Sequence, residues 1–395
     1  MFGGNARHTH VKNRMMKLTG SHKSSIHVCF VAALLIFTSL GLNCDCRKSN
    51  PIIPPPTDKD STLSVFEPVW SPDGRSILLF GRINQRIDYD LYRVDSSGGL
   101  IRLLNRDSLG KIRPTVSPNG MLLAYLAADA TKLFSAAHIW VMNIDGTSAH
   151  DLTTVGGNWK HFRWSPDSRY ILAEAPVSDS GVTNYQVIRL EVSTKKLLYL
   201  TRGKYDSYNA SYFYDGSKII FNSGRQIAFN GGGRVWIMNP DGSNPVPLDT
   251  SQHGSSSPVP SPVDNRIVFD WGLGLESDAG VYMANLDSIT LPANPSTYRF
   301  LGVAVGSPQW SPNGQRILFS AGNEGGVKDL YVLQLATGEV TRLTEGFQVF
   351  ASTCAWSPTS QDIVFQAQDT SMTLRSIFVY HLESNSLKKL TLQLK

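Results

Sequence analysis

The chain has 395 residues, of which 41% are hydrophobic and 17% are charged, a balance that supports a folded core and excludes a disordered chain. The net charge of +5 comes from the first 44 residues, which hold five basic residues and no acidic ones, so the rest of the chain has 32 of each and is neutral. The rest of the chain has no excess of basic residues that could bind a phosphate backbone, and nucleic-acid binding is therefore not expected.

The N-terminal region predicts export. Residues 28–42 read VCFVAALLIFTSLGL, a fifteen-residue apolar run preceded only by basic charge. This order matches the basic and apolar regions of a signal sequence, and the run is shorter than the roughly 20 residues of a membrane span. A start at Met15 or Met16 would give a leader of more ordinary length than a start at Met1. We expect residues 1–43 to be a signal or lipoprotein leader.

The residues after this run resemble a bacterial lipoprotein signal. Gly41-Leu42-Asn43-Cys44 places a cysteine behind a short box, although Asn43 stands where the family pattern has Gly, Ala or Ser. The resemblance implies lipidation at Cys44, with ordinary cleavage near this point or an uncleaved anchor as alternatives. Residues 44–62 include the run Pro51–Pro56 and predict an extended, semi-rigid tether.

The remaining sequence is built from a repeat. Ser-Pro recurs at six places, and the degenerate copy Tyr212–Gly216 stands where a seventh would be expected, so the marks are 46 to 50 residues apart; the six serines are Ser71, Ser117, Ser165, Ser261, Ser311 and Ser357. Proline followed by Asp-Gly or Asn-Gly favours a tight turn between two strands. A second strand (Ile317–Phe319, for example), a third (Leu330–Val332) and a fourth that ends in Leu-Thr follow each mark.

Four short antiparallel strands in each unit of about 47 residues are typical of a propeller blade. We expect residues 63–395 to form one all-β domain, a single β-propeller of about seven four-stranded antiparallel blades. Two repeats are weak, since the third has Ile188 in place of an aromatic residue and the fourth lacks Ser-Pro, so the number of blades could differ by one.

The pattern Trp70-Ser-Pro-Asp-Gly-Arg75, followed by Ile-Trp-Val-Met-Asn and Asp-Gly, resembles the WD40-like propeller repeat of TolB-type proteins. This resemblance implies a non-catalytic binding protein of the bacterial cell envelope. Together with the leader and the lipoprotein-like signal, it leads us to expect a periplasmic protein that is tethered as a lipoprotein at the outer membrane or the cell surface. The resemblance implies a protein or glycan partner. TolB carries a further N-terminal α/β domain, for which the segment between Cys44 and Val65 is too short. We expect the propeller to be monomeric.

A candidate binding site follows from the register of the repeats. Seven polar residues lie four positions before the seven turns, on strands that are otherwise apolar, and we call them the polar ring: Glu67, Arg113, His161, Asn209, Ser257, Ser307 and Thr353. We expect this ring at the mouth of the central channel, where a small ligand or a peptide could bind. A hydrated rim with no ligand is the alternative. Four residues just upstream would widen the same funnel: Lys111, Trp159, Lys160 and Tyr208.

The sequence offers little for catalysis. It has no Gly-x-Ser-x-Gly motif, and Cys354 is the single cysteine of the repeat region, so neither a disulfide framework nor a cysteine-based zinc site is expected. Oligogalacturonate lyases, a related propeller family, gather several histidines around a metal, whereas here His161 and His253 alone lie near innermost strands. We therefore predict no catalytic residue, metal or cofactor. A carbohydrate-active enzyme, such as a metal-dependent oligouronate lyase, is the alternative function.

Overall fold

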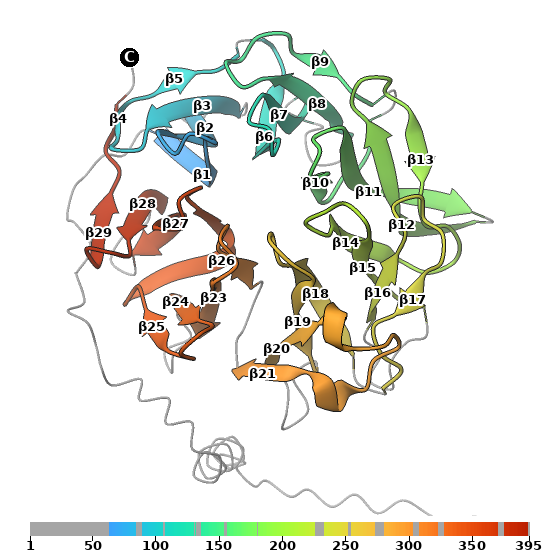
Figure 1. Ribbon diagram of the computed structural model, residues 1–395. Coiled ribbons are helices and arrows are strands. Elements are labelled where there is room, and N and C mark those ends of the chain that lie inside the picture. The colour runs from blue at the N-terminus through green and yellow to red at the C-terminus, as the bar shows by residue number, and fades with distance from the viewer. Residues whose placement is uncertain are drawn as a thin grey trace, which may run out of the picture. The chain divides into compact units, whose positions relative to one another are not determined.

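A computed structural model describes residues 63–393, apart from 84–88, 106, 130, 132–135, 154–155, 180, 226–232, 252–253, 273–279, 303–307, 323–327 and 370–374. The leader, the tether and Cys44, as well as Ser307 and His253, therefore lie outside the described residues. The described chain forms seven four-stranded antiparallel sheets that stand around a central axis (Figure 1). The prediction of a seven-bladed β-propeller is confirmed.

Each blade uses four strands taken in chain order from the centre outwards. The first three blades consist of β1 (Leu63–Trp70), β2 (Ser76–Ile83), β3 (Asp90–Asp95) and β5 (Arg102–Leu103); β6 (Gly110–Val116), β7 (Leu122–Ala128), β8 (His138–Asn143) and β9 (His150–Asp151); and β10 (Phe162–Trp164), β11 (Tyr170–Asp179), β12 (Val182–Glu191) and β13 (Leu197–Tyr199).

The last four blades follow the same order. They consist of β14 (Ser207–Tyr212), β15 (Ile219–Ser223), β16 (Arg234–Met238) and β17 (Val246–Pro247); β18 (Ser255–Pro260), β19 (Arg266–Trp271), β20 (Gly280–Asn285) and β21 (Arg299–Gly302), with the 3-10 helices η4 (Leu286–Ser288) and η5 (Pro295–Thr297); β22 (Gln309–Trp310), β23 (Arg316–Gly322), β24 (Lys328–Gln334) and β25 (Val340–Arg342); and β26 (Phe347–Trp356), β27 (Asp362–Asp369), β28 (Arg375–His381) and β29 (Ser386–Lys389).

The Ser-Pro turns owe their stability to the serine. The Ser71 hydroxyl donates to Asp73 Oδ1 at 2.5 Å and accepts from the backbone N–H of Ser76 at 2.9 Å, so it closes the turn between β1 and β2. The fourth blade has Phe213 in this place and keeps the backbone bond from Gly216 N to Phe213 O at 2.9 Å. Because Phe213 is fully buried, packing takes over from the missing hydroxyl.

Tryptophans at the ends of innermost strands join neighbouring blades. Trp164 Nε1 donates to the Thr115 carbonyl at 3.1 Å, and Trp310 Nε1 donates to the Val259 carbonyl at 3.0 Å. Both side chains are buried among apolar residues of two blades. These tryptophans therefore pack between blades, and the core is a set of clusters between sheets.

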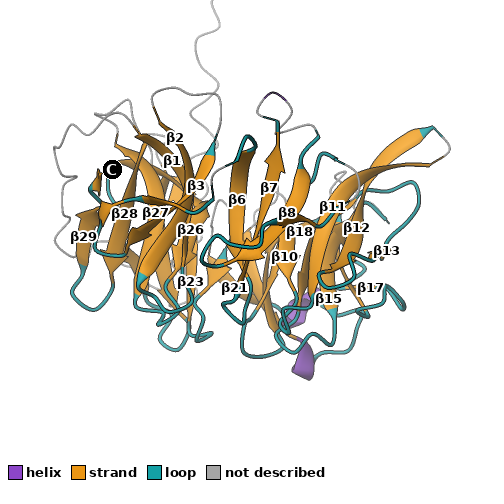
Figure 2. Cartoon of the chain, turned by 90° about the horizontal axis from the view of Figure 1, so that it is seen from above, coloured by secondary structure: helices purple, strands orange, loops and turns teal. Residues whose placement is uncertain are grey.

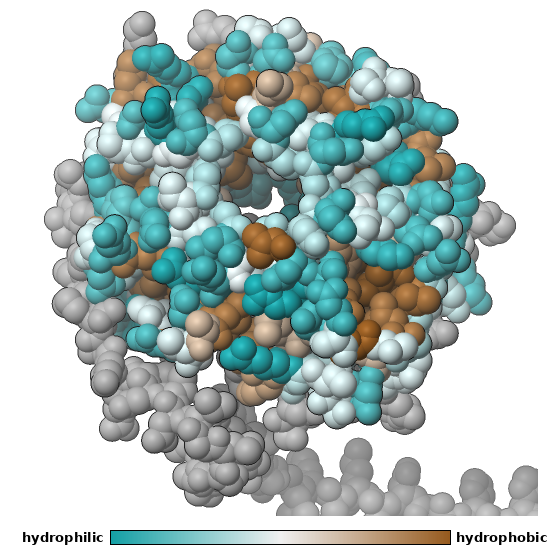
Figure 3. Space-filling view, in the orientation of Figure 1, coloured by the Kyte–Doolittle hydropathy of each residue, from teal (hydrophilic) through white to brown (hydrophobic). Residues whose placement is uncertain are grey.

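The two faces of the propeller differ in their connections. We call the face that carries the Ser-Pro turns the turn face, and the opposite face, where the innermost strands begin, the loop face. Seen from the side, the strands run from one face to the other, and η4 and η5 lie on the turn face (Figure 2). At the centre of the ring the molecule is open, and the surface around the opening is mainly hydrophilic to neutral (Figure 3).

The ring closes by contacts between its first and last blades. β1 packs against β26, β27 and β28, and Trp70 Nε1 donates to the Ala355 carbonyl at 3.1 Å. At the outer edge β30 (Leu392–Gln393) pairs in parallel with β4 (Gly99–Leu100). Among the described strands no blade mixes segments from the two ends of the chain, and we call this short parallel pair the latch of the ring.

Candidate functional site

Four members of the polar ring lie on bulges of the innermost strands. Glu67, Arg113, Asn209 and Ser257 have positive φ values of 44°, 56°, 54° and 51°. Strand pairing shifts by one residue at each of these four places. A bulge re-aims the side chain that it carries, and positive φ is uncommon for residues other than glycine. These four ring positions thus share a backbone geometry as well as a polar side chain.

The bulges place the ring inside the channel wall. Glu67 is the fifth residue of β1, Arg113 the fourth of β6 and Asn209 the third of β14. Their side chains are partly buried. These three residues therefore lie three to five positions into their strands, counted from the loop face, and the place of the ring at the channel mouth stays a prediction.

Three ring members from the first three blades lie close enough to interact electrostatically. Burial raises the pKa of the Glu67 carboxyl, while the charges of Arg113 and His161 oppose this shift. The guanidinium of Arg113 donates Nη1–H to the Lys160 carbonyl at 2.6 Å, which ties the second blade to the third. An acid, a guanidinium and an imidazole thus share one side of the channel.

His161 connects this group to a buried carboxylate. Its Nδ1 is 3.4 Å from Glu174 Oε2, and the Glu174 side chain is 2% exposed whereas that of His161 is 54% exposed. Glu174 Oε1 also accepts from the backbone N–H of Ala210 at 3.1 Å. Glu174 therefore fixes the imidazole of His161 and joins the third blade to the fourth.

Arg163 is a charged neighbour of this group that the sequence analysis missed. Its side chain is exposed, and its guanidinium interacts electrostatically with Glu174. Arg163 lies two positions after His161 on the short strand β10. The alternation of sides along a strand could have indicated it.

Polar residues continue the wall into the fourth and fifth blades. Asn222 Oδ1 accepts from the backbone N–H of Ser257 at 3.1 Å, and Asn209 Nδ2 is 3.5 Å from the same oxygen. Burial raises the pKa of Asp270 to about 6, while a hydrogen bond from the Ser257 hydroxyl acts to lower it. Asn222 lies on β15 and Asp270 on β19, the second strands of the fourth and fifth blades. The repeat pattern did not mark a polar position on the second strands, so the sequence analysis missed both residues.

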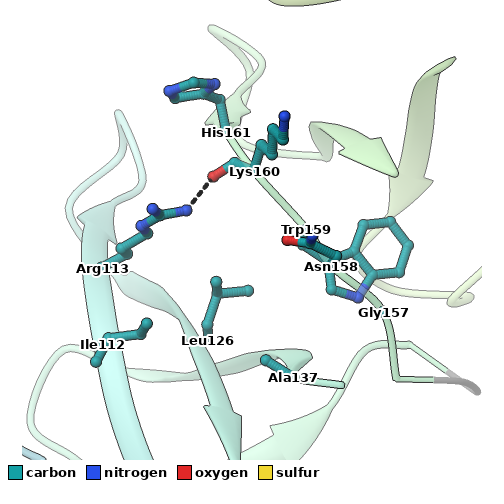
Figure 4. Close-up of a pocket in the computed structure, with 9 residues that line it drawn as sticks. All are labelled: Ile112, Arg113, Leu126, Ala137, Gly157, Asn158, Trp159, Lys160 and His161. Carbon is teal, nitrogen blue, oxygen red and sulfur yellow. Dashed lines mark hydrogen bonds between the residues drawn. The ribbon is translucent and has the colours of Figure 1, made fainter. Parts of the chain in front are cut away.

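A cavity of about 260 Å³ opens beside the ring between the second and third blades (Figure 4). Ile112, Leu126 and Ala137 supply apolar walls, and Arg113, Lys160 and His161 lie together at one side. Gly157, Asn158 and Trp159 complete the lining. Trp159 and Lys160, which the sequence analysis expects to widen the funnel, thus line this cavity.

The other two funnel residues behave differently. Lys111 is fully buried, and its ammonium lies 2.7 Å from Asp107 Oδ1 and 3.0 Å from the Leu109 carbonyl. The expectation that Lys111 widens the funnel is therefore wrong, since an ion pair at the root of β6 holds it. Tyr208 is partly buried, and this burial raises the pKa of its phenol. Thr353 takes its ring place on β26 and is partly buried.

Two classes of site are not found among the described residues. No three His, Cys, Asp or Glu side chains in the described parts of the chain converge as metal ligands. None of the described helices is long and apolar enough to pass through a bilayer.

Comparisons with known proteins bear on the fold. No protein-family model matches the chain. An 88-residue stretch is 30% identical to the Tol-Pal system protein TolB of Francisella tularensis subsp. mediasiatica, a match that covers 22% of this chain and 20% of TolB. This chain is a seven-bladed propeller, and one 88-residue stretch of it is similar to TolB. The TolB-like propeller is also 25% identical over 272 residues to the uncharacterized protein Atu1656 of Agrobacterium fabrum, over 65% of this chain and 85% of that protein.

The TolB-like propeller also resembles solved enzymes in fold. An oligogalacturonate lyase in complex with manganese superposes with a TM-score of 0.64 and 14% sequence identity, over 85% of this chain and 98% of the lyase. Identity at this level reports the fold alone. The function of this chain must therefore be argued from its own channel residues.

Proposed function

We propose that this TolB-like propeller is a non-catalytic binding module of the bacterial cell envelope, which holds a protein or glycan partner at its loop face. The observation that carries the proposal is the group formed by Glu67, Arg113 and His161 beside the cavity. These side chains offer an acceptor and several donors at one opening, which suits a polar partner.

The contacts of these side chains hold them in positions that suit binding of a polar partner. Arg113 is held by the Lys160 carbonyl, and His161 by Glu174, so both are positioned by the blades around them. Positioned donors at a largely pre-formed opening reduce the entropy lost on binding. Export through the leader and retention through Cys44 would bring this face to envelope partners.

A matched pair of variants tests the proposal. The full chain is used as bait for detergent-solubilised envelope proteins and for purified peptidoglycan. Arg113→Ala with His161→Ala removes two ring members, and Arg75→Ala with His150→Ala removes the same residue types from the turn face. We expect retention of the partner to fall at least about tenfold for the ring pair, the effect of losing charge-assisted hydrogen bonds, and to stay unchanged for the turn-face pair.

Two outcomes would contradict this function. Equal retention by the ring pair and the turn-face pair would remove the loop face as the binding site. Cleavage of oligogalacturonate by the wild-type chain with manganese would instead establish the alternative, a metal-dependent oligouronate lyase.

A further inference from the structure

The cavity between the second and third blades contains a buried donor with no acceptor. Trp159 is 5% exposed, and its indole Nε1 has no hydrogen-bond partner among the described residues. Trp70 and Trp164 donate their indole N–H groups to carbonyls of neighbouring blades at 3.1 Å, whereas Trp236 and Trp356 also bury an indole N–H that has no partner among the described residues. Trp159 differs from these two because it lines the cavity, where a ligand can supply the acceptor that its costly unpaired donor lacks.

The backbone leaves space beside this donor. A Cβ atom added to Gly157 would lie 3.3 Å from Trp159 Nε1, tighter than most contacts that a Cβ makes. The φ of Gly157 is not in the left-handed region, so its conformation does not require glycine. The missing side chain therefore keeps the approach to the indole nitrogen open.

The rest of the cavity is apolar within and cationic at its rim. Ile112, Leu126 and Ala137 are buried and form the walls. Arg113 donates one N–H group to the Lys160 carbonyl, and the remaining N–H groups of its planar guanidinium are suited to bind a carboxylate. Lys160 carries its ammonium 3.8 Å above the Tyr185 ring, at the same rim.

We propose that this cavity binds an N-acylated apolar amino acid. Its carboxylate is held by Arg113 at the rim, its side chain packs against Ile112 and Leu126, and its acyl carbonyl accepts from Trp159 Nε1. The volume of about 260 Å³ lies just below that of pockets for drug-sized ligands, so it suits one residue. Such a group occurs free or as the C-terminal residue of a peptide. This inference deepens the proposed function by naming the chemistry that the loop face recognises.

Calorimetric titration of the full chain with N-acetyl-leucine and with N-acetyl-leucinamide tests the charge. We expect the acid to bind at least about tenfold more tightly than the amide, since the amide keeps the apolar side chain and loses the anion. Equal affinities, or no heat from the acid at millimolar concentration, would overturn the proposal. A peptide that ends in leucine separates the two sources: tighter binding than N-acetyl-leucine assigns the peptide end, and equal binding assigns the free compound.

Two variants test the cavity without touching the polar ring. Trp159→Phe keeps an aromatic ring and removes the N–H, and we expect about a fivefold loss of affinity for N-acetyl-leucine. Gly157→Ala should weaken binding further, while Gly322→Ala, where no atom lies within 4 Å of the added Cβ, should leave it unchanged. Circular dichroism confirms that each variant is folded. Unchanged affinity in both cavity variants would overturn the proposed site.

The same variants separate this inference from the proposed function. Trp159→Phe is also used as bait for envelope partners. If it keeps the partner but loses N-acetyl-leucine, the loop face binds its partner through the polar ring and the cavity binds its ligand independently. If wild type retains no partner but binds N-acetyl-leucine, the proposed function fails and the cavity assignment stands.

Discussion

Several polar side chains of this propeller are partly or fully buried, and different contacts offset the desolvation of each. Lys111 is paired with Asp107, and Glu174 accepts from Ala210 and faces His161. Asp270 has the hydroxyl of Ser257 and is otherwise desolvated, so its pKa is raised to about 6. Burial of a carboxylate without a cation costs free energy at neutral pH.

Asp270 therefore makes the propeller less stable as the pH rises. The unfolded carboxyl has a pKa of about 3.9. Below about pH 4 the Asp270 carboxyl is protonated in both the folded and the unfolded state, so it does not change the free energy of unfolding. Between about pH 4 and 6 the unfolded state releases this proton more readily than the folded state, so the free energy of unfolding falls as the pH rises. Above pH 6 the full penalty applies, about 1–3 kcal/mol from a shift of roughly two pKa units.

We expect Asp270→Asn to raise the free energy of unfolding by about 1–3 kcal/mol at pH 8 and to leave it unchanged at pH 4. Urea denaturation at the two pH values measures the difference. Asp145→Asn is the control with opposite sign, because hydrogen bonds from Thr147 lower the pKa of Asp145. A gain for Asp270→Asn that is equal at both pH values would contradict this account.

At the scale of elements, the innermost strands combine an apolar strand with one polar residue on a bulge. Four of the described bulges place a non-glycine residue at positive φ, and proline follows three of them, at Pro68, Pro114 and Pro258. Proline cannot donate to a strand partner, so it suits a place where pairing is already interrupted. In these three blades the repeat sequence thus encodes the bulge as well as the polar residue on it.

Asn209 tests the backbone requirement. We expect Asn209→Gly to be neutral or slightly stabilising, because glycine adopts φ near 54° without strain, and Asn209→Val to lose about 1–2 kcal/mol, because a β-branched residue does not. Thermal unfolding measures both. Ser211, two positions on in the paired part of β14, should show the reverse order for the same substitutions. The same order at both positions would mean that the bulge imposes no φ requirement.

At the scale of the whole molecule, stability depends on closing the ring. Gly99 N donates to the Thr391 carbonyl at 2.7 Å and Ile101 N to the Gln393 carbonyl at 2.9 Å. Lys388 Nζ also donates to the Ser97 carbonyl at 2.9 Å. These bonds join segments that are almost 300 residues apart, so they form late and hold the first blade to the last.

Removal of residues 391–395 should lower the free energy of unfolding by about 1–3 kcal/mol, the effect of losing two backbone hydrogen bonds and the packing of Leu392. Hydrogen exchange should increase at the amides of Gly99 and Ile101. A chain that lacks only residues 394–395 keeps β30 and is the control. Equal stability of the two shortened chains would show that the latch does not hold the ring closed.

The sequence by itself determined the blades. The turn at Ser71–Gly74 and its copies are local, because each serine bonds to residues two and five positions away, and local patterns can be read in one dimension. The ring position of Arg113 followed from the same spacing. The weak third and fourth repeats still form full blades, since packing of residues such as Ile188 and Phe213 replaces the missing marks.

Tertiary structure alone decided the site. Arg113 meets Lys160, His161 meets Glu174, and β30 meets β4, all through contacts between separate strands or blades that no repeat spacing encodes. Lys111 is buried because its ammonium pairs with Asp107, a contact that the repeat spacing does not encode. The open space at Trp159 exists because a glycine of one blade faces a wall made by another. Repeats fix which residues recur, and the packing of blades fixes which of them meet.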